Sequence, residues 1–114
     1  MTTQLALVDR VSLRQKIESG EMFVLVDALS LISYAASHLP GAIHMPPESV
    51  DERAPRRIPD LQTEIVVYCS SPDCESSVAV GERLVELGYE NVRHYAGGKR
   101  DWLDAGLPLE GGRA

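Results

Sequence analysis

The sequence has no excess of positive charge, no long apolar run and very little cysteine. Its 114 residues carry a formal net charge of -6. Such a chain lacks the long-range attraction for phosphate backbones and anionic lipids that nucleic-acid and membrane-surface proteins use. No stretch reaches the roughly 18 apolar residues of a membrane span, and the first ten residues lack the basic and then apolar pattern of a signal peptide. We therefore expect a cytoplasmic protein that binds neither nucleic acid nor membrane.

The composition and the order of segments indicate one α/β domain over residues 1–114. With 44% apolar and 25% charged residues, the chain is globular in composition. Continuous apolar runs at 22–28 and 64–69 predict buried strands, and the segments 42–45 and 91–95 predict two further strands. Between them lie helical patterns, listed here by range: 12–21 with Ser12 as N-cap, 31–39, a short helix within 47–59, about 76–87, and 99–106. This alternation predicts a mainly parallel central sheet flanked by helices.

Two side chains that carry chemistry stand directly at the ends of predicted strands. Asp27 ends the first run and Cys69 ends "EIVVYC". Because ligands of such sheets bind beyond the carboxyl ends of the strands, we expect these two residues to share one rim of the sheet. We expect Asp27 to accept hydrogen bonds from backbone amides near the loop.

Cys69 is followed by a polar loop that opens into a helix. Free amides and the dipole at a helix N-terminus lower the pKa of a thiol, and the loop amides and serine hydroxyls add donors. We therefore interpret Cys69 as a reactive thiolate. The alternative is a small, buried and inert cysteine that closes the strand.

Cys74, the second of only two cysteines, lies five positions after Cys69. This spacing is not the C-x2-C of redox pairs or zinc sites, and the three histidines are scattered singly, so no metal site is predicted. Cys74 is either a thiol that attacks an oxidised or sulfurated Cys69, or a residue that only fills the loop. A phosphatase loop would place Arg where this chain has Glu75, which argues against phosphate binding.

Four segments together resemble the rhodanese-like family, which has a three-layer α/β fold. They are "VLVDA", "SHLPGAIHMP", "VVYC" and "LGYENVRHYAGGKRDWLDAGLPL", and they occur in the family's order. The resemblance covers nearly the whole chain, with the domain core at about residues 12–109. In its "HLPG" turn, His38 is expected to make a structural hydrogen bond.

The resemblance implies a sulfurtransferase that needs no metal or organic cofactor. Cys69 would be the catalytic residue, accepting sulfane sulfur as a persulfide and passing it to a thiol, cyanide or protein acceptor. Its partners would be small sulfur donors and acceptors or a protein of a sulfur relay. The cradle for the persulfide would be the loop, with Asp27, Lys99 and Arg100 as supporting residues; the loop residues are Ser70, Ser71, Pro72, Asp73, Cys74, Glu75 and Ser76.

The loop departs from the family in length and charge. It has no Lys or Arg, it carries Asp73 and Glu75, and it is one or two residues longer than the family's usual loop. We therefore expect thiosulfate, a dianion, to be a poor donor. Lys99 and Arg100 would supply charge at the rim, although solvated surface positions are the more common reading for such residues. Two alternatives stay open: a thiol redox or sensor protein that uses Cys69 and Cys74, and a non-catalytic binding module with the same fold.

Overall fold

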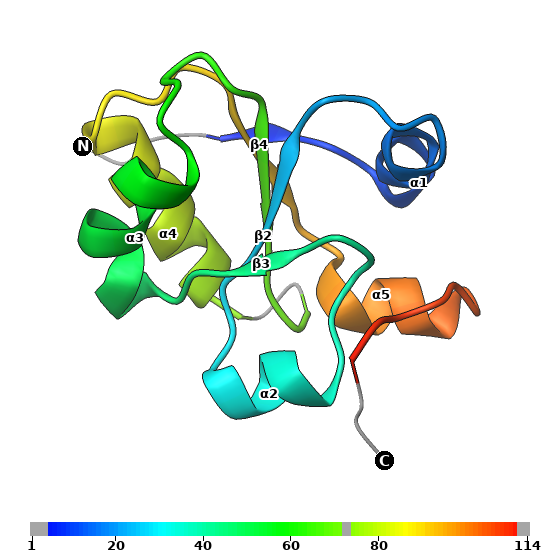
Figure 1. Cartoon of the computed structure of the whole chain (residues 1–114). Coiled ribbons are helices and arrows are strands. Elements are labelled where there is room, and N and C mark those ends of the chain that lie inside the picture. The colour runs from blue at the N-terminus through cyan, green and yellow to red at the C-terminus, as the bar shows by residue number, and fades with distance from the viewer. Residues whose placement is uncertain (1–4, 72–73, 112–114) are drawn as a thin grey trace.

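The computed structural model describes residues 5–71 and 74–111, and they form a parallel sheet covered by helices on both faces (Figure 1). The strands are β1 (Ala6–Leu7), β2 (Val24–Asp27), β3 (Ile43–His44), β4 (Ile65–Tyr68) and β5 (Val92–Tyr95). They lie in the order β1-β5-β4-β2-β3, and every pair is parallel. The α/β class with a parallel central sheet, predicted from the alternating segments, is confirmed.

Most of the helices form two layers, one on each face of the sheet. They are α1 (Arg10–Glu18), α2 (Leu31–Ala36), the 3-10 turn η1 (Pro47–Ser49), α3 (Val50–Arg57), α4 (Ser76–Glu86) and α5 (Gly98–Asp104). One face of the sheet packs against α3 and α4, and the other packs against α1 and α5. In Figure 1, α2 lies beyond the ends of the strands, next to α5.

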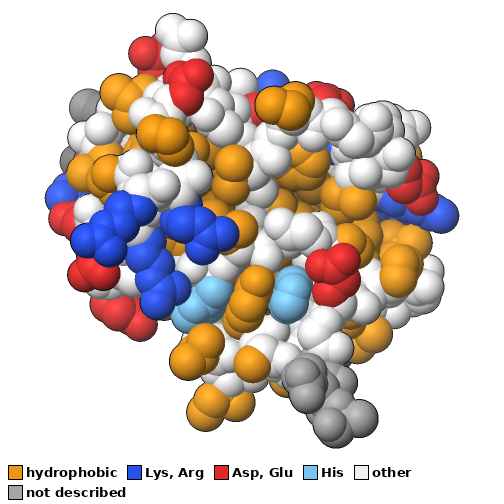
Figure 2. All heavy atoms as spheres, in the orientation of Figure 1, with side chains coloured by type: hydrophobic (Ala, Val, Ile, Leu, Met, Phe, Trp, Pro, Cys, Tyr) orange, Lys and Arg blue, Asp and Glu red, His pale blue; other side chains and the backbone are white. Residues whose placement is uncertain are grey.

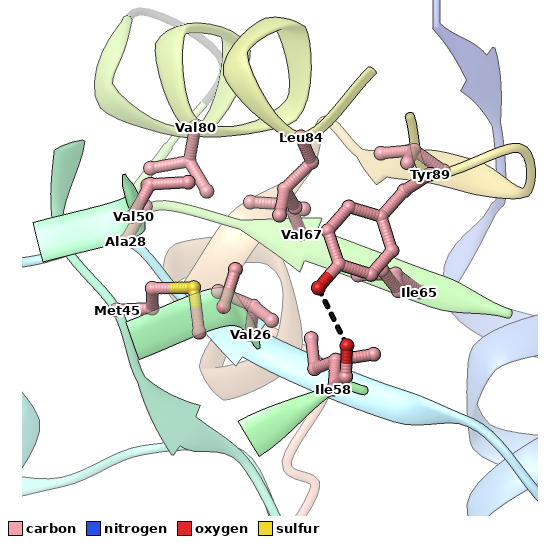
Figure 3. Packing of buried hydrophobic residues seen from close by; sticks show 12 residues of the cluster. Val26, Ala28, Met45, Val50, Ile58, Ile65, Val67, Val80, Leu84 and Tyr89 are labelled. Atoms are coloured by element: carbon pink, nitrogen blue, oxygen red, sulfur yellow. Dashed lines mark hydrogen bonds between the residues drawn. The ribbon is translucent and has the colours of Figure 1, made fainter. Parts of the chain in front are cut away.

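The first core cluster fills the space between the sheet and the pair α3 and α4. Figure 3 shows Val26, Ile65 and Val67 pointing up from the strands toward Val80 and Leu84 of α4. The hydroxyl of Tyr89 donates to the carbonyl of Ile58 at 2.5 Å, so the buried phenol oxygen has a partner (Figure 3). Because β4 is buried on both faces, its sequence is a continuous apolar run with no polar alternation.

The second cluster packs α1 and α5 against the opposite face. Leu13 and Trp102 are its helical anchors, and Tyr68 and Tyr95 come from the strands. The indole nitrogen of Trp102 donates to the carbonyl of Pro108 at 2.8 Å, which ties the end of the described chain to α5. This layer fixes the position of α5 next to the end of β4.

The first helix begins earlier than the sequence pattern predicts. We expected Ser12 to be the N-cap, but the helix starts at Arg10, and the carboxylate of Asp9 accepts from the amide of Ser12 at 2.7 Å. The prediction was wrong because Asp is as good an N-cap as Ser and stands three residues before a free amide. Strand β1 was not predicted either, since two exposed residues leave no periodic pattern.

Charged side chains are distributed unevenly over the surface. Figure 2 shows a group of Lys and Arg side chains over the region of α3, with apolar side chains along the lower edge, where α2 lies. Helix α3 carries Arg53, Arg56 and Arg57, and α2 exposes Leu31 and Ile32. Within the part of the chain that the structure describes, no helix has the length and apolar character to cross a membrane.

Candidate functional site

Asp27 and Cys69 lie at the same edge of the sheet, at the ends of neighbouring strands. The register pairs Asp27 with Tyr68, and the amide of Ala28 donates to the carbonyl of Tyr68 at 3.0 Å. Cys69 is therefore the first residue beyond β4, where the chain leaves the sheet for α4. The two side chains predicted to share this rim are thus brought together by the register.

The loop that follows Cys69, residues 69–76, is called the cysteine loop below. Cys69 is buried, Ser70 is exposed, and Cys74 is half-buried. The amide of Cys74 donates to the carbonyl of Ser71 at 3.1 Å. Of the residues predicted for this loop, Pro72 and Asp73 lie outside the described residues.

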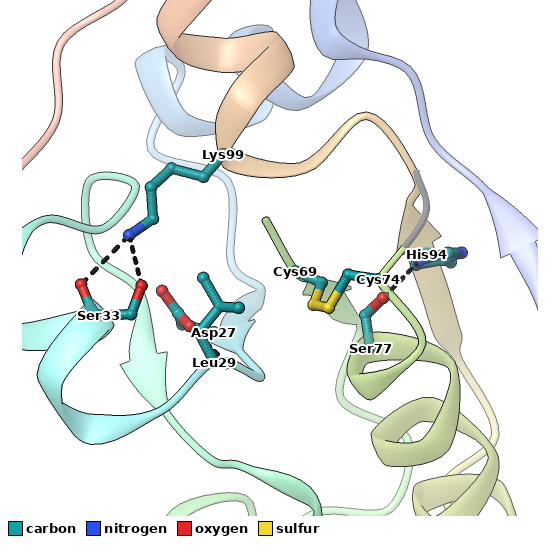
Figure 4. Close-up of a disulfide and its surroundings, with 8 residues drawn as sticks. All are labelled: Asp27, Leu29, Ser33, Cys69, Cys74, Ser77, His94 and Lys99. Atoms are coloured by element: carbon teal, nitrogen blue, oxygen red, sulfur yellow. Dashed lines mark hydrogen bonds between the residues drawn. A yellow bond between two sulfur atoms is a disulfide. The ribbon is translucent and has the colours of Figure 1, made fainter. Parts of the chain in front are cut away.

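The sulfur atoms of Cys69 and Cys74 are bonded to each other in this structure (Figure 4). Their Cα atoms are 6.1 Å apart, a separation typical of disulfides. Sequence spacing alone left open whether the two sulfurs meet, and the structure brings them together. The structure therefore shows the cysteine loop in its disulfide form.

The start of α5 holds the cysteine loop from the other side. The amide of Lys99 donates to the carbonyl of Cys69 at 2.9 Å, and the amide of Arg100 donates to the carbonyl of Ser70 at 2.7 Å. Gly98 has a φ of +70°, and a Cβ there would stand 2.7 Å from the carbonyl oxygen of Cys69. Only glycine permits this approach, so Gly98 has a direct role in placing the loop.

Lys99 is not a solvated surface residue, although that was the reading favoured from the sequence. Its ammonium donates to the carbonyl of Ser33 at 3.2 Å, as Figure 4 shows, and to the carbonyl of Ser37 at 2.6 Å. Burial lowers the pKa of Lys99, and the nearby carboxylate of Asp27 opposes that shift. The sequence could not reveal this, because the partners lie more than sixty positions away on α2 and just after it. Lys99 ties α5 to α2 across the rim.

Arg100 remains exposed, next to the loop. Together with Lys99 it lines a pocket of about 230 Å³, whose other walls are Ser33, Ser70 and Leu103. The cysteine loop itself has no cation, so Arg100 is the exposed positive side chain of this pocket. The backbone amide of Arg100 also donates to the carbonyl of Ser70, which keeps Arg100 next to the cysteine loop.

Asp27 is fully buried and has two hydrogen-bond donors. One oxygen accepts from the amide of Leu29 at 2.8 Å, as predicted for a residue that binds nearby amides. The other accepts from the hydroxyl of Tyr68 at 2.6 Å, and that hydroxyl accepts from the amide of Leu39 at 3.0 Å. Burial, followed by the charge of Asp27, raises the pKa of Tyr68 far above its ordinary value. Sequence reasoning missed Tyr68 because its partners depend on strand register.

A second polar pair lies beside the cysteine loop. The hydroxyl of Ser77, in the first turn of α4, and Nε2 of His94, on β5, are 2.8 Å apart, and Figure 4 shows them on the side of Cys74 away from Asp27. Burial lowers the pKa of His94. The hydroxyl of Ser77 is thus engaged by His94 and not by the described part of the cysteine loop. His38 makes the expected structural contact, with Nδ1 2.9 Å from the carbonyl of Tyr34.

The start of α4 faces the cysteine loop. Glu75 is its N-cap and makes no side-chain hydrogen bond to the helix, and Ser76 is its first residue. Among the described residues, no side chain is seen to cap the amides of this first turn. A helix N-terminus of this kind favours negative charge near it, which suits a thiolate.

Comparison with known proteins identifies the family. The family model described as "Rhodanese-like domain" matches residues 9–105. The chain belongs to the rhodanese-like family. The match includes the end of β4, the cysteine loop and the start of α5, which are the segments that form the site.

Relatives of known name support a sulfur-handling role for this family. The chain is 28% identical to the putative sulfur carrier protein YrkF of Bacillus subtilis, over 78% of this chain and 46% of that protein. It is 34% identical to the thiosulfate sulfurtransferase GlpE of Haemophilus influenzae, over 76% of this chain and 79% of GlpE. The crystal structure of BH2092 from Bacillus halodurans superposes with a TM-score of 0.86 at 26% identity, covering 93% of this chain and 77% of that one. The chain spans about half the length of two of the curated relatives that it matches.

Proposed function

We propose that the protein is a sulfurtransferase in which Cys69 carries sulfane sulfur as a persulfide. The observation that carries the proposal is the position of Cys69 at the end of β4, between the start of α4 and the amides of α5. Membership of a family with sulfurtransferases and a sulfur carrier among its relatives supports it.

The chemistry consists of two displacements at sulfur: the first loads sulfur onto Cys69, and the second removes it. In the open dithiol form, the thiolate of Cys69 attacks the sulfane sulfur of a donor, the bond from that sulfur to the donor breaks, and the donor fragment leaves with the electron pair. The persulfide then meets an acceptor nucleophile, such as a thiol or cyanide, which takes the outer sulfur and restores the thiolate. No change in net oxidation state and no cofactor is involved in this exchange.

The charge of the site favours donors other than thiosulfate. The cysteine loop brings Glu75 and no cation, and the ammonium of Lys99 is already bonded to carbonyls. Of the two cations that line the pocket, Arg100 is the exposed one. A dianionic donor would meet one positive side chain against a carboxylate, so we expect persulfides or polysulfides to be better donors than thiosulfate.

A protein partner is also supported by the surface beside the pocket. Leu31, Ile32 and Leu103 expose 65%, 84% and 55% of their surface, and they lie on the two helices that line the pocket. Apolar side chains in such a group suit contact with another protein. Ile32→Glu should slow transfer from a protein persulfide and leave transfer from a small polysulfide unchanged; equal rates with both donors would contradict a docking role.

Mass spectrometry of the reduced protein tests the main proposal. After incubation with thiosulfate, polysulfide or a persulfidated protein donor, the peptide that contains Cys69 should gain the mass of one sulfur atom. Cys69→Ser should abolish the gain and leave the unfolding midpoint nearly unchanged. If no donor adds sulfur to Cys69, the proposal is wrong. If the variant unfolds at much lower denaturant, Cys69 is a structural core residue.

The bonded sulfurs favour a second candidate, a thiol redox protein. Its function would be the reversible conversion of the Cys69 and Cys74 thiols to the disulfide by an oxidant. Mild oxidation followed by thiol counting tests it, and two thiols that persist in oxidant would exclude it. We place the protein in the cytoplasm, where thiols are kept reduced, so that the dithiol is the resting form; recovery from a periplasmic or secreted fraction would contradict this.

A further inference from the structure

The two cysteines differ in how they are held. Cys69 is buried at the end of β4, and its carbonyl is fixed by α5 at 2.9 Å. Cys74 is half-buried, and its amide donates to the carbonyl of Ser71. The disulfide joins Sγ of Cys74 to Sγ of Cys69, so Sγ of Cys74 can reach the inner sulfur of any persulfide on Cys69.

We propose that Cys74 resolves the persulfide on Cys69 and releases sulfide, an inference that rests on the proposed function. The thiolate of Cys74 attacks Sγ of Cys69. The bond between Sγ of Cys69 and the outer sulfur breaks, and the outer sulfur leaves with the electron pair as hydrosulfide. The two thiols are oxidised to the disulfide while the sulfane sulfur is reduced to sulfide, so electrons balance within the protein.

Attack at the inner sulfur is the route that the geometry favours. Attack at the outer sulfur would move the persulfide to Cys74 and leave the Cys69 thiolate free, and no bond between the two Sγ atoms would form. The two Sγ atoms meet in the structure, so Cys74 reaches the atom at which inner attack must occur. The chemistry of the loop agrees, since it has no cation to retain a negative persulfide and has a carboxylate at Glu75, directly after Cys74.

Turnover needs a dithiol reductant. Such a reductant attacks the Cys69–Cys74 disulfide, becomes a cyclic disulfide itself, and returns both cysteines to thiols. The net reaction converts the sulfane sulfur of a donor and a dithiol into sulfide and an oxidised dithiol. The protein would thus have a sulfide-releasing activity besides transfer to an acceptor, and the disulfide would be its resting product when no reductant is present.

A single-turnover experiment tests the inference. The reduced wild-type protein, freed of reductant and kept anaerobic, is mixed with one equivalent of thiosulfate or of tetrasulfide and quenched with an alkylating bimane. The bimane traps sulfide, and peptide mapping locates persulfide and disulfide. We expect wild type to release sulfide in step with formation of the Cys69–Cys74 disulfide. Cys74→Ser should accumulate persulfide on Cys69 and release sulfide only at the level of the protein-free control.

Two controls keep the result interpretable. Cys74→Ala repeats the substitution without a hydroxyl, and the circular dichroism spectra of both variants establish that they fold. Wild type that is oxidised to the disulfide before the donor is added has no thiol, and it should release no sulfide.

Each other outcome overturns a distinct statement. If wild type and Cys74→Ser hold equal persulfide on Cys69 and release no sulfide, the inference is wrong and the proposed function stands. If wild type carries the extra sulfur on Cys74 without sulfide release, Cys74 relays sulfur instead of resolving it, and the inference is again wrong. If neither protein takes up sulfur from either donor, the proposed function and the inference both fall.

Discussion

Gly98 lies against the carbonyl of Cys69 so closely that any side chain at position 98 would collide with the loop. A Cβ there would be 2.7 Å from the carbonyl oxygen of Cys69 and 2.9 Å from the amide nitrogen of Ser71. Both neighbours are backbone atoms and neither can rotate away. The contact therefore couples the start of α5 to the position of the candidate catalytic cysteine.

Gly98→Ala should lower both stability and the reactivity of Cys69. The left-handed conformation costs an alanine about 1–2 kcal/mol, and the collision with the loop adds to it. Gly106→Ala is the matched control, because Gly106 has a φ of +77° and nothing within 4 Å of its Cβ position. Urea unfolding and the rate of Cys69 alkylation measure the two effects. Equal losses in the two variants would show that the loop contact contributes nothing.

Tyr68→Phe should be strongly destabilising. The hydroxyl of Tyr68 is the partner of a buried carboxylate oxygen of Asp27 and of the amide of Leu39. Removing it leaves a neutral donor and a charged acceptor unpaired, at a cost of about 3 kcal/mol or more by urea unfolding. Tyr89→Phe, which frees only the carbonyl of Ile58, is the comparator and should cost less. A Tyr68→Phe loss no larger than that of Tyr89→Phe would refute this view of the Asp27 network.

The same network predicts how stability depends on alkaline pH. Because the pKa of Tyr68 is raised in the folded state, the unfolded tyrosine loses its proton first, above its ordinary pKa of 10.0. The contribution of Tyr68 to stability is complete below that pH and falls as pH rises above it, by up to about 1.4 kcal/mol per pH unit. Lys99 also titrates at alkaline pH. The difference in the free energy of unfolding between wild type and Tyr68→Phe therefore separates the effect of Tyr68 from that of Lys99. A difference that stays constant from pH 9 to pH 11 (about the span around an ordinary tyrosine pKa) would contradict it.

Local patterns predicted the sheet and the position of Cys69. Strand β4 is buried on both faces, so its continuous apolar run was easy to recognise, and a residue directly after it must lie at the carboxyl rim. Asp27 followed from the same reasoning on β2, since neighbouring parallel strands end together. The contact between Cys69 and Cys74 was left open because loop conformation, and not spacing, decides whether two sulfurs meet.

What the sequence could not predict depends on distant partners. Lys99 was assigned to the solvent because exposed lysines are common, and its acceptors at Ser33 and Ser37 come from another helix region. For Tyr68 the sequence predicted a position in a strand, but not its hydrogen bonds to Asp27 and Leu39. The sequence predicted Ser12 as the N-cap, whereas the structure has Asp9. Both residue types cap helices, and the path of the chain after β1 decides between them.

The burial of His94 predicts a loss of stability in mild acid. Burial lowers the pKa of His94 below its ordinary 6.5, so the unfolded chain binds a proton there before the folded one does. Stability contributed by neutral His94 is present above pH 6.5 and falls as pH drops below it. The melting temperature of wild type should fall more between pH 7.5 and 5.5 (about one unit to each side of an ordinary histidine pKa) than that of His94→Gln. Ser77→Ala keeps the imidazole and should keep the wild-type pH slope; parallel curves for wild type and His94→Gln would dismiss His94 as the cause.

Arg100 should determine how well the protein accepts anionic donors. Its guanidinium is exposed in the pocket beside Ser70, where the cysteine loop offers no cation of its own. Removing one unit charge that contacts an anion in water changes their interaction free energy by about 1 kcal/mol. This corresponds to a severalfold change in affinity, and the change becomes smaller as salt is added. Arg100→Ala should therefore raise the KM for thiosulfate severalfold and leave transfer from a neutral organic trisulfide unchanged.

Arg56→Ala is the matched control for charge, because Arg56 is exposed on α3, on the opposite face of the sheet. It should leave the KM for both donors at the wild-type value, since a charge that far from the pocket is screened. Steady-state rates at low and high salt measure all three proteins. If Arg100→Ala slows the neutral and the anionic donor equally, Arg100 acts on the shape of the loop through the contact of its amide with Ser70. If it slows neither, the positive charge of the pocket has no part in donor choice.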